Sequence, residues 1–111
     1  MDLREEAVGG VTVLEVKGRI DSGTAPVLGE KLTALLGEPG RRLLLDLRQL
    51  DYISSAGFRI LLLSAKRADA AGNRFVLCGV SGKVRQLFDL GGFLDLFAIS
   101  GSREEGLAAV Q

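Results

Sequence analysis

The run "RRLLLDL", residues 41–47, is the feature that most constrains how this chain folds. It is a continuous apolar stretch of strand length, which is typical of a central strand covered on both faces. The rest of the chain must therefore supply elements that cover two sides of a sheet. A length of 111 residues fits one domain with a single modest core. We expect one domain over residues 1–111.

Strand and helix patterns alternate around this run. The segment 11–18, "VTVLEVKG", predicts a strand with Thr12, Leu14 and Val16 on one face and Glu15 and Lys17 on the other. Further strands are predicted over 2–8, 74–80 and near 95–99. A first helix is predicted to begin at a Ser22 or Thr24 cap and to end at the sequence GEPG, residues 37–40. Further helices are predicted over 57–71, from Ser81 to the glycines at 91–92, and near 103–110. This order predicts an α/β domain with a mainly parallel mixed sheet and helices packed on it.

The stretch "DYISSAGFRIL", residues 51–61, places two serines at the start of a leucine-rich helix. Ser54 is an N-cap candidate whose hydroxyl oxygen would accept a hydrogen bond from the amide of residue 56 or 57. Ser55 would then be the first helical residue, with its hydroxyl facing solvent. Both serines lie near the carboxyl end of the 43–47 strand, at the edge where open parallel sheets place ligands and chemistry. Structural capping and a functional hydroxyl both remain open.

The composition excludes several classes of enzyme. The chain has no histidine, so neither a Ser-His-Asp nor a Cys-His nucleophile system can be assembled. Transition-metal sites lose their commonest ligand, and the single cysteine, Cys78, fits a buried core position. The serine turn lacks the first glycine of a nucleophile elbow and the lysine of a phosphate loop. We expect no catalytic residues, no metal site and no cofactor, although carboxylate chemistry stays open in principle.

Charge and hydropathy bear on partners and location. Fourteen basic residues balance fourteen acidic ones, so nothing general draws the chain to nucleic acid or an anionic membrane. The N-terminus lacks a signal-peptide pattern, and no apolar run has the length to span a bilayer. A lone cysteine fits a reducing compartment. We expect a soluble, cytoplasmic protein that does not insert into membranes.

Three motifs occur together and in order: "GRID" followed by "TA", "DLRQLDYISSAG", and "LCGVSGKVRQLFDLGG". In this combination the chain resembles the STAS family, the domain of sulphate transporters and bacterial anti-sigma factor antagonists. The resemblance covers roughly residues 8 to 110. Because the chain carries no transporter segment, it looks like a stand-alone antagonist.

The resemblance implies a phosphoacceptor serine two residues before the helix-opening Gly57. That position is Ser55, with Ser54 as the less favoured alternative. The antagonist pattern usually has aspartate before this serine and serine or threonine after it, whereas this chain has Ser54 and Ala56. Asp21 resembles an acidic position that the family uses in kinase recognition, and a turn-forming aspartate is the alternative.

The resemblance also implies partner switching. The unphosphorylated domain would bind an anti-sigma factor that is itself an ATP-dependent serine kinase, and so free the sigma factor. The kinase would then phosphorylate the domain and release it, and a metal-dependent serine phosphatase would reset it. We expect a monomer or weak dimer that docks through Asp21, Ser22, Thr24, Tyr52, Ser54, Ser55, Ala56, Gly57 and Arg59. The alternative is a STAS subunit of a lipid-transport ABC system or another non-phosphorylated scaffold.

Overall fold

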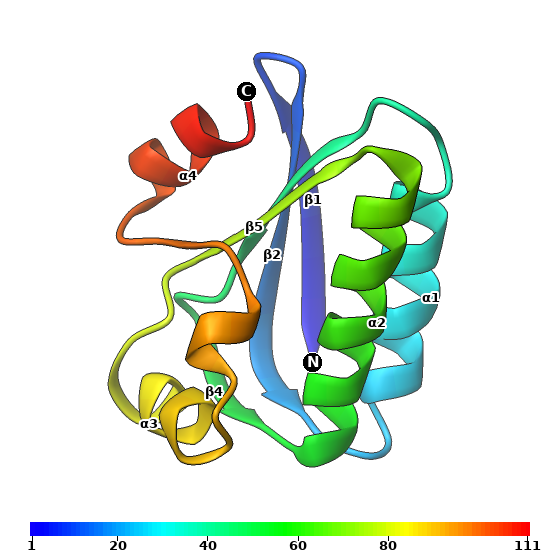
Figure 1. Ribbon diagram of the computed structural model, residues 1–111. Helices are drawn as coiled ribbons and strands as arrows, with labels where there is room; N and C mark the ends of the chain where they lie inside the picture. Colours follow the sequence, from blue (N-terminus) through cyan, green and yellow to red (C-terminus); the bar gives the residue numbers. More distant parts are fainter.

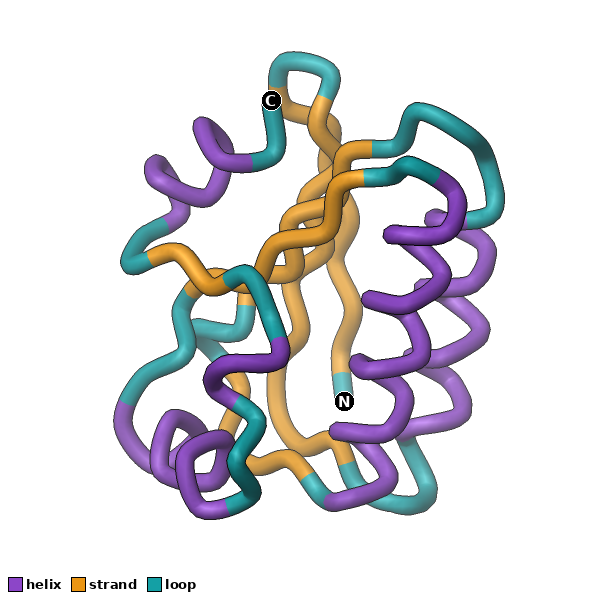
Figure 2. Tube along the Cα trace, in the orientation of Figure 1, coloured by secondary structure: helices purple, strands orange, loops and turns teal.

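The computed structural model describes residues 1–111 and shows a mixed sheet flanked by helices (Figures 1 and 2). The strands are β1 (Asp2–Val8), β2 (Val11–Ile20), β3 (Arg42–Asp46), β4 (Leu50–Ile53), β5 (Arg74–Cys78) and β6 (Ile99–Ser100). The helices are α1 (Ala25–Leu36), α2 (Ser55–Ala71), α3 (Gly82–Leu90) and α4 (Arg103–Ala109), with a short 3₁₀ turn η1 (Leu94–Leu96).

The sheet has the strand order β1-β2-β3-β5-β6, and β4 pairs with β2 off this path. Only the β1–β2 hairpin is antiparallel, and all other pairs are parallel. The predicted α/β class, with a mainly parallel mixed sheet, is therefore confirmed.

β3 lies inside the sheet and is covered on both faces, as its apolar run predicts. Leu43 and Leu45 belong to the main core, into which α1, α2 and α3 bury their apolar sides. Leu44 points to the opposite face and packs in a smaller cluster with Val110, beyond the end of α4. Figure 1 shows α1 and α2 together on one side of the sheet and α4 on the other.

At four places the structure shows more than the sequence predicted or differs from it. The face of β2 that carries Glu15 and Lys17 also buries Val11 and Val13, because α4 covers its first half. The helical spacing of apolar residues in the first helix predicts a buried stripe of Val27, Leu28, Leu32, Leu35 and Leu36, but Val27 is 54% exposed. The last strand is only Ile99–Ser100, since η1 occupies the residues before it. The fourth difference is β4, which was not predicted at all.

β4 exists because β2 changes neighbours part of the way along its length. β2 pairs with β3 over Thr12–Glu15 and with β4 over Gly18–Ile20. The change falls at an irregularity between Gly18 and Arg19, where Gly18 has a φ of 100° that favours glycine. The serine turn therefore follows β4, and not β3 directly as the sequence suggested.

Candidate functional site

The serine turn and the loop after β2 lie side by side at one edge of the sheet. Ile20 and Ile53, the last residues of β2 and β4, are register partners in a parallel pair. The backbone N–H of Ser54 donates to the carbonyl oxygen of Ile20 at 2.8 Å. Since parallel strands end at the same edge, the segments 18–25 and 51–59 lie together and form one surface.

Gly57 allows the helix to begin this close to the strand ends. A Cβ atom at this position would lie 2.7 Å from Cγ2 of Ile20 and 2.7 Å from Cγ1 of Ile53. No side chain fits there without displacing both isoleucines. Gly57 is buried, so its contribution to the site is to place the first turn of α2 directly on β2 and β4.

The two serines have different surroundings. Ser54 is the N-cap of α2, and its Oγ accepts the N–H of Gly57 at 3.2 Å. Its carbonyl oxygen accepts the N–H of Phe58 at 3.0 Å. Ser55 is the first helical residue, it is exposed, and its hydroxyl makes no hydrogen bond within the protein. Capping therefore accounts for Ser54 and leaves the hydroxyl of Ser55 available to a partner.

Asp21 and Thr24 close a compact turn opposite the serines. Oδ1 of Asp21 accepts the N–H groups of Gly23 and Thr24, each at 3.0 Å. Oγ1 of Thr24 accepts the N–H of Asp21 and donates to the carbonyl of Arg19, both at 2.9 Å. The hydrogen bond from Thr24 N–H is the main reason that the pKa of Asp21 is lowered below its usual value of 3.8.

This turn bears on three predicted residues. The turn-forming alternative for Asp21 is present in the structure, while its Oδ2 makes no hydrogen bond and stays free to meet a cation. Thr24 stands at the N-cap of α1, but neither Thr24 nor the exposed Ser22 caps that helix with its side chain. The hydroxyl of Thr24 is instead used inside the turn.

Arg19 is a residue of this surface that sequence reasoning missed. Its guanidinium lies over the ring of Tyr52, 4.4 Å from the centroid, and the two residues are register partners in β2 and β4. Such a contact stabilises the arginine in one position. No local pattern could reveal it, because the pairing requires β4. Arg59, one helical turn after Ser55, is exposed and forms no ion pair.

The surface is suited to a macromolecular partner more than to a small substrate. Neither Ser54 nor Ser55 lines a cavity, and Ala56 is half-buried beside them. The structure has no group of three or more acidic or cysteine side chains placed to hold a metal ion. None of the helices combines the length and the apolar character needed to cross a membrane. What the site offers is a free hydroxyl at a helix start, flanked by one carboxylate and two guanidinium groups.

Comparison with known proteins places this site in context. BtrV of Bordetella bronchiseptica, provisionally named an anti-sigma factor antagonist, is 38% identical over 109 residues, which cover 98% of this chain and 94% of BtrV. The anti-sigma-B factor antagonist of Bacillus subtilis is 33% identical over 94 residues, 85% of each chain. The crystal structure of an anti-sigma factor antagonist from Mycobacterium paratuberculosis has a TM-score of 0.85 and 26% identity, with 98% of this chain and 92% of that one covered.

The family model of the STAS domain matches residues 3–106. All three motifs that carried the resemblance lie within that range, and so do both segments of the surface described above. The match extends over nearly the whole sheet and all of α1, α2 and α3. This chain therefore belongs to the STAS domain family.

Proposed function

We propose that this chain is an anti-sigma factor antagonist that is switched by phosphorylation of Ser55. The observation that carries the proposal is the exposed, unbonded hydroxyl of Ser55 at the start of α2. The names of the relatives support the regulatory role. In this scheme the unphosphorylated protein binds an anti-sigma factor with serine kinase activity in the cytoplasm, and the sigma factor is released.

The helix start allows the modification without unfolding. A phosphoryl group adds about −1.5 to −2 charge at neutral pH. At a helix N-terminus the free amides and the helix dipole favour that charge by about 0.3–1 kcal/mol. Ser54 keeps its cap on Gly57 while Ser55 is modified, because the two hydroxyls have separate roles. The phosphorylated fold is therefore expected to be as stable as the unmodified one.

The same charge is expected to end partner binding. Burying a phosphate against a surface without a matched basic pocket costs several kcal/mol, of which each ~1.4 kcal/mol is a tenfold loss of affinity. The Oδ2 atom of Asp21 and the guanidinium of Arg19 lie on the same surface and supply fixed charges for recognition. A metal-dependent serine phosphatase would then restore the binding form, and the protein would act as a monomer or weak dimer.

Kinase assay and mass mapping test the assignment. The protein is incubated with the serine-kinase anti-sigma factor from the same genome and ATP, and we expect one phosphate on Ser55. Ser55→Ala is expected to abolish the label and to remain bound to the kinase, while Ser55→Asp is expected to bind weakly. Ser54→Ala is the matched control and should still be labelled.

Two results would contradict the proposal in different ways. Full labelling of Ser55→Ala together with loss of label in Ser54→Ala would move the acceptor by one residue. Binding to the kinase without any modification would instead favour a non-phosphorylated STAS scaffold, such as the subunit of a lipid-transport system, for which Ser54 in place of the usual aspartate is the supporting observation.

A further inference from the structure

The largest cavity of the molecule is separate from the serine turn. It lies beyond the carboxyl ends of β3, β5 and β6, between α3 and α4, and has a volume of about 850 Å³. Only three of its 13 lining residues are hydrophobic. The carboxyl edge of parallel strands is where open α/β sheets place ligands, and small-molecule sites measure about 300–1,000 Å³. The position and size of this polar cavity therefore fit a small ligand.

Three arginines from different elements line the cavity. Arg48 follows β3, Arg85 lies on α3, and Arg103 opens α4. Arg85 is exposed and forms no ion pair. Guanidinium groups present several N–H donors in a planar fork, which matches the oxygens of carboxylates and phosphates. Arginines from three different elements therefore contribute to the cavity wall.

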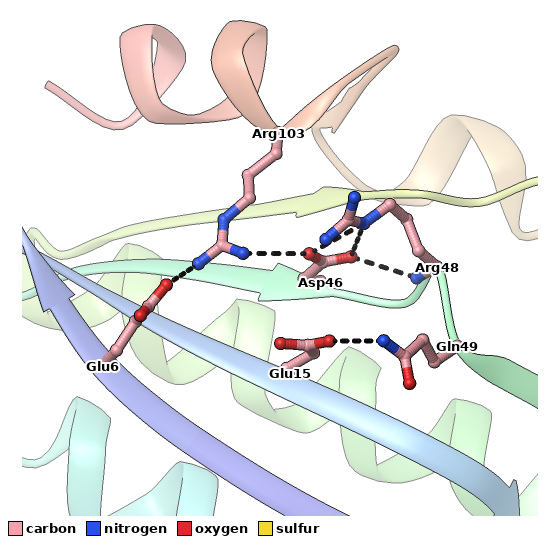
Figure 3. A network of polar contacts seen from close by, with 6 residues as sticks. All are labelled: Glu6, Glu15, Asp46, Arg48, Gln49 and Arg103. Atoms are coloured by element: carbon pink, nitrogen blue, oxygen red, sulfur yellow. Dashed lines mark hydrogen bonds and ion pairs between the residues drawn. The ribbon is translucent and has the colours of Figure 1, made fainter.

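A buried carboxylate holds two of these arginines in place (Figure 3). Asp46 is fully buried, and it accepts the backbone N–H of Arg48 at 3.0 Å and the Nε of Arg48 at 3.2 Å. Nη1 of Arg103 lies 3.9 Å from Oδ2 of Asp46, and Nη2 of Arg103 contacts Glu6. A buried charge must be paired, so Asp46 fixes Arg48 and Arg103 at the cavity wall. The two terminal nitrogens of Arg48 have no partner in the protein and stay available.

Unbonded hydroxyls lie in the same cavity. Ser81 is the N-cap residue of α3, yet its side chain makes no capping hydrogen bond. Ser100, at the end of β6, makes no side-chain hydrogen bond either, whereas Ser102 caps α4 through the N–H of Glu105. Together with the arginines, Ser81 and Ser100 give a set of donors that the fold itself does not use.

The acidic residues of the cavity limit the charge that a ligand can carry. Asp95 and Glu104 also line it, and both are exposed. These carboxylates would repel a second anionic group on a ligand and would accept hydrogen bonds from hydroxyl or amino groups. We propose that this cavity binds a small organic molecule with one oxyanion group and neighbouring hydroxyls, held by Arg48, Arg85 and Ser81. This site does not depend on Ser55 or on the proposed function.

Nitrogen-15 NMR titration tests the proposal with two probes, inorganic phosphate and glycerol 3-phosphate. Ionic strength is held constant with sodium chloride. We expect saturable chemical-shift changes at the amides of 81–84 and 100–103. Glycerol 3-phosphate should bind more tightly than phosphate, because its hydroxyl groups can donate hydrogen bonds to Asp95 and Glu104. Arg85→Gln should weaken both probes about tenfold, the value of one charge-assisted hydrogen bond. Arg59→Gln removes the same charge from an exposed position on α2 and should leave these shifts unchanged.

Three outcomes would overturn the proposal: no saturable shifts with either probe, shifts confined to the start of α2, or equal affinity in Arg85→Gln and the wild type. Ser81→Ala provides a second variant that removes a donor without changing charge, and it too should weaken binding. The spectra of both variants report directly whether the fold is retained. Labelling of Ser55 by the kinase should be normal in Arg85→Gln, so that failure of this inference and failure of the proposed function can be distinguished.

Discussion

Replacing Ser54 by alanine removes one hydrogen bond from the start of α2 and leaves the surrounding backbone contacts in place. The lost bond is the 3.2 Å contact between Ser54 Oγ and the N–H of Gly57. Two backbone hydrogen bonds remain, because they do not involve the side chain: the N–H of Ser54 donates to the carbonyl of Ile20, and the carbonyl of Ser54 accepts the N–H of Phe58. Loss of an N-cap side chain costs about 0.5–2 kcal/mol, and one half-buried cap of this length suggests ~1 kcal/mol.

Ser55→Ala is the matched comparison, because it removes the same hydroxyl one residue later. That hydroxyl is exposed and unbonded, so the stability should stay within about 0.5 kcal/mol of the wild type. Urea unfolding followed by circular dichroism measures both variants. With a slope of about 1–3 kcal/mol/M, a loss of ~1 kcal/mol lowers the midpoint by roughly 0.3–1 M.

The reasoning is refuted if Ser54→Ala and the wild type unfold at the same urea concentration. It is also refuted if Ser55→Ala loses as much stability as Ser54→Ala, since that result would mean that Ser55 carries part of the cap. A change of slope in either variant would show an altered unfolded state, and the midpoints would then need comparison by thermal unfolding.

Four further predictions follow from individual residues. Gly57→Ala should lower the free energy of unfolding by about 1–3 kcal/mol, because the new methyl group would overpack against Ile20 and Ile53. Gly23→Ala is the control and should cost little, because its Cβ would lie 3.4 Å from the nearest atom, Oδ1 of Asp21. The urea midpoints of the two variants measure the difference. Hydrogen bonds lower the pKa of Asp21 below 3.8, so the stabilisation by its carboxylate is complete above that pH and is lost as the pH falls through the lowered value. Asp21→Asn should therefore remove this part of the acid dependence of stability, as measured by unfolding curves recorded from about pH 5 to 2. Charge reversal at Arg59 should weaken kinase binding without changing the circular dichroism spectrum. Lys66→Glu on the same helix is the control. Unaltered affinity of the Arg59 variant would mean that Arg59 contacts only solvent and not the partner. Burial raises the pKa of the Cys78 thiol to about 11, so it should react slowly with a disulfide reagent at neutral pH and rapidly once urea unfolds the chain.

Local sequence patterns predicted much of this fold because they describe short-range physics. The helix α2 ends at Gly72 in the left-handed conformation, as the "GN" signal predicted, and its N-cap is Ser54. The apolar run at 43–45 identified a strand covered on both faces, since only a covered strand can bury side chains on both sides. The exposed position of Ser55 followed from the same capping rule.

Other parts of the site depend on contacts between distant residues. Leu50–Ile53 is too short for a periodic pattern, and it is a strand only because β2 changes partner at Gly18. The contact of Arg19 with Tyr52 and the closeness of Ser54 to Ile20 both result from that pairing.

The ion pairs around Asp46 show the same dependence on tertiary structure. In sequence, Asp46 simply ends an apolar run, and Arg103 lies 57 positions later in the chain numbering. Their interaction exists because α4 folds back over the far face of the sheet and buries Val11 and Val13 beneath it. A sequence pattern determines what each residue does within one helical turn or one strand. Which strands become neighbours, and which charges are then buried together, is decided by packing of the whole chain, because only packing removes those groups from water.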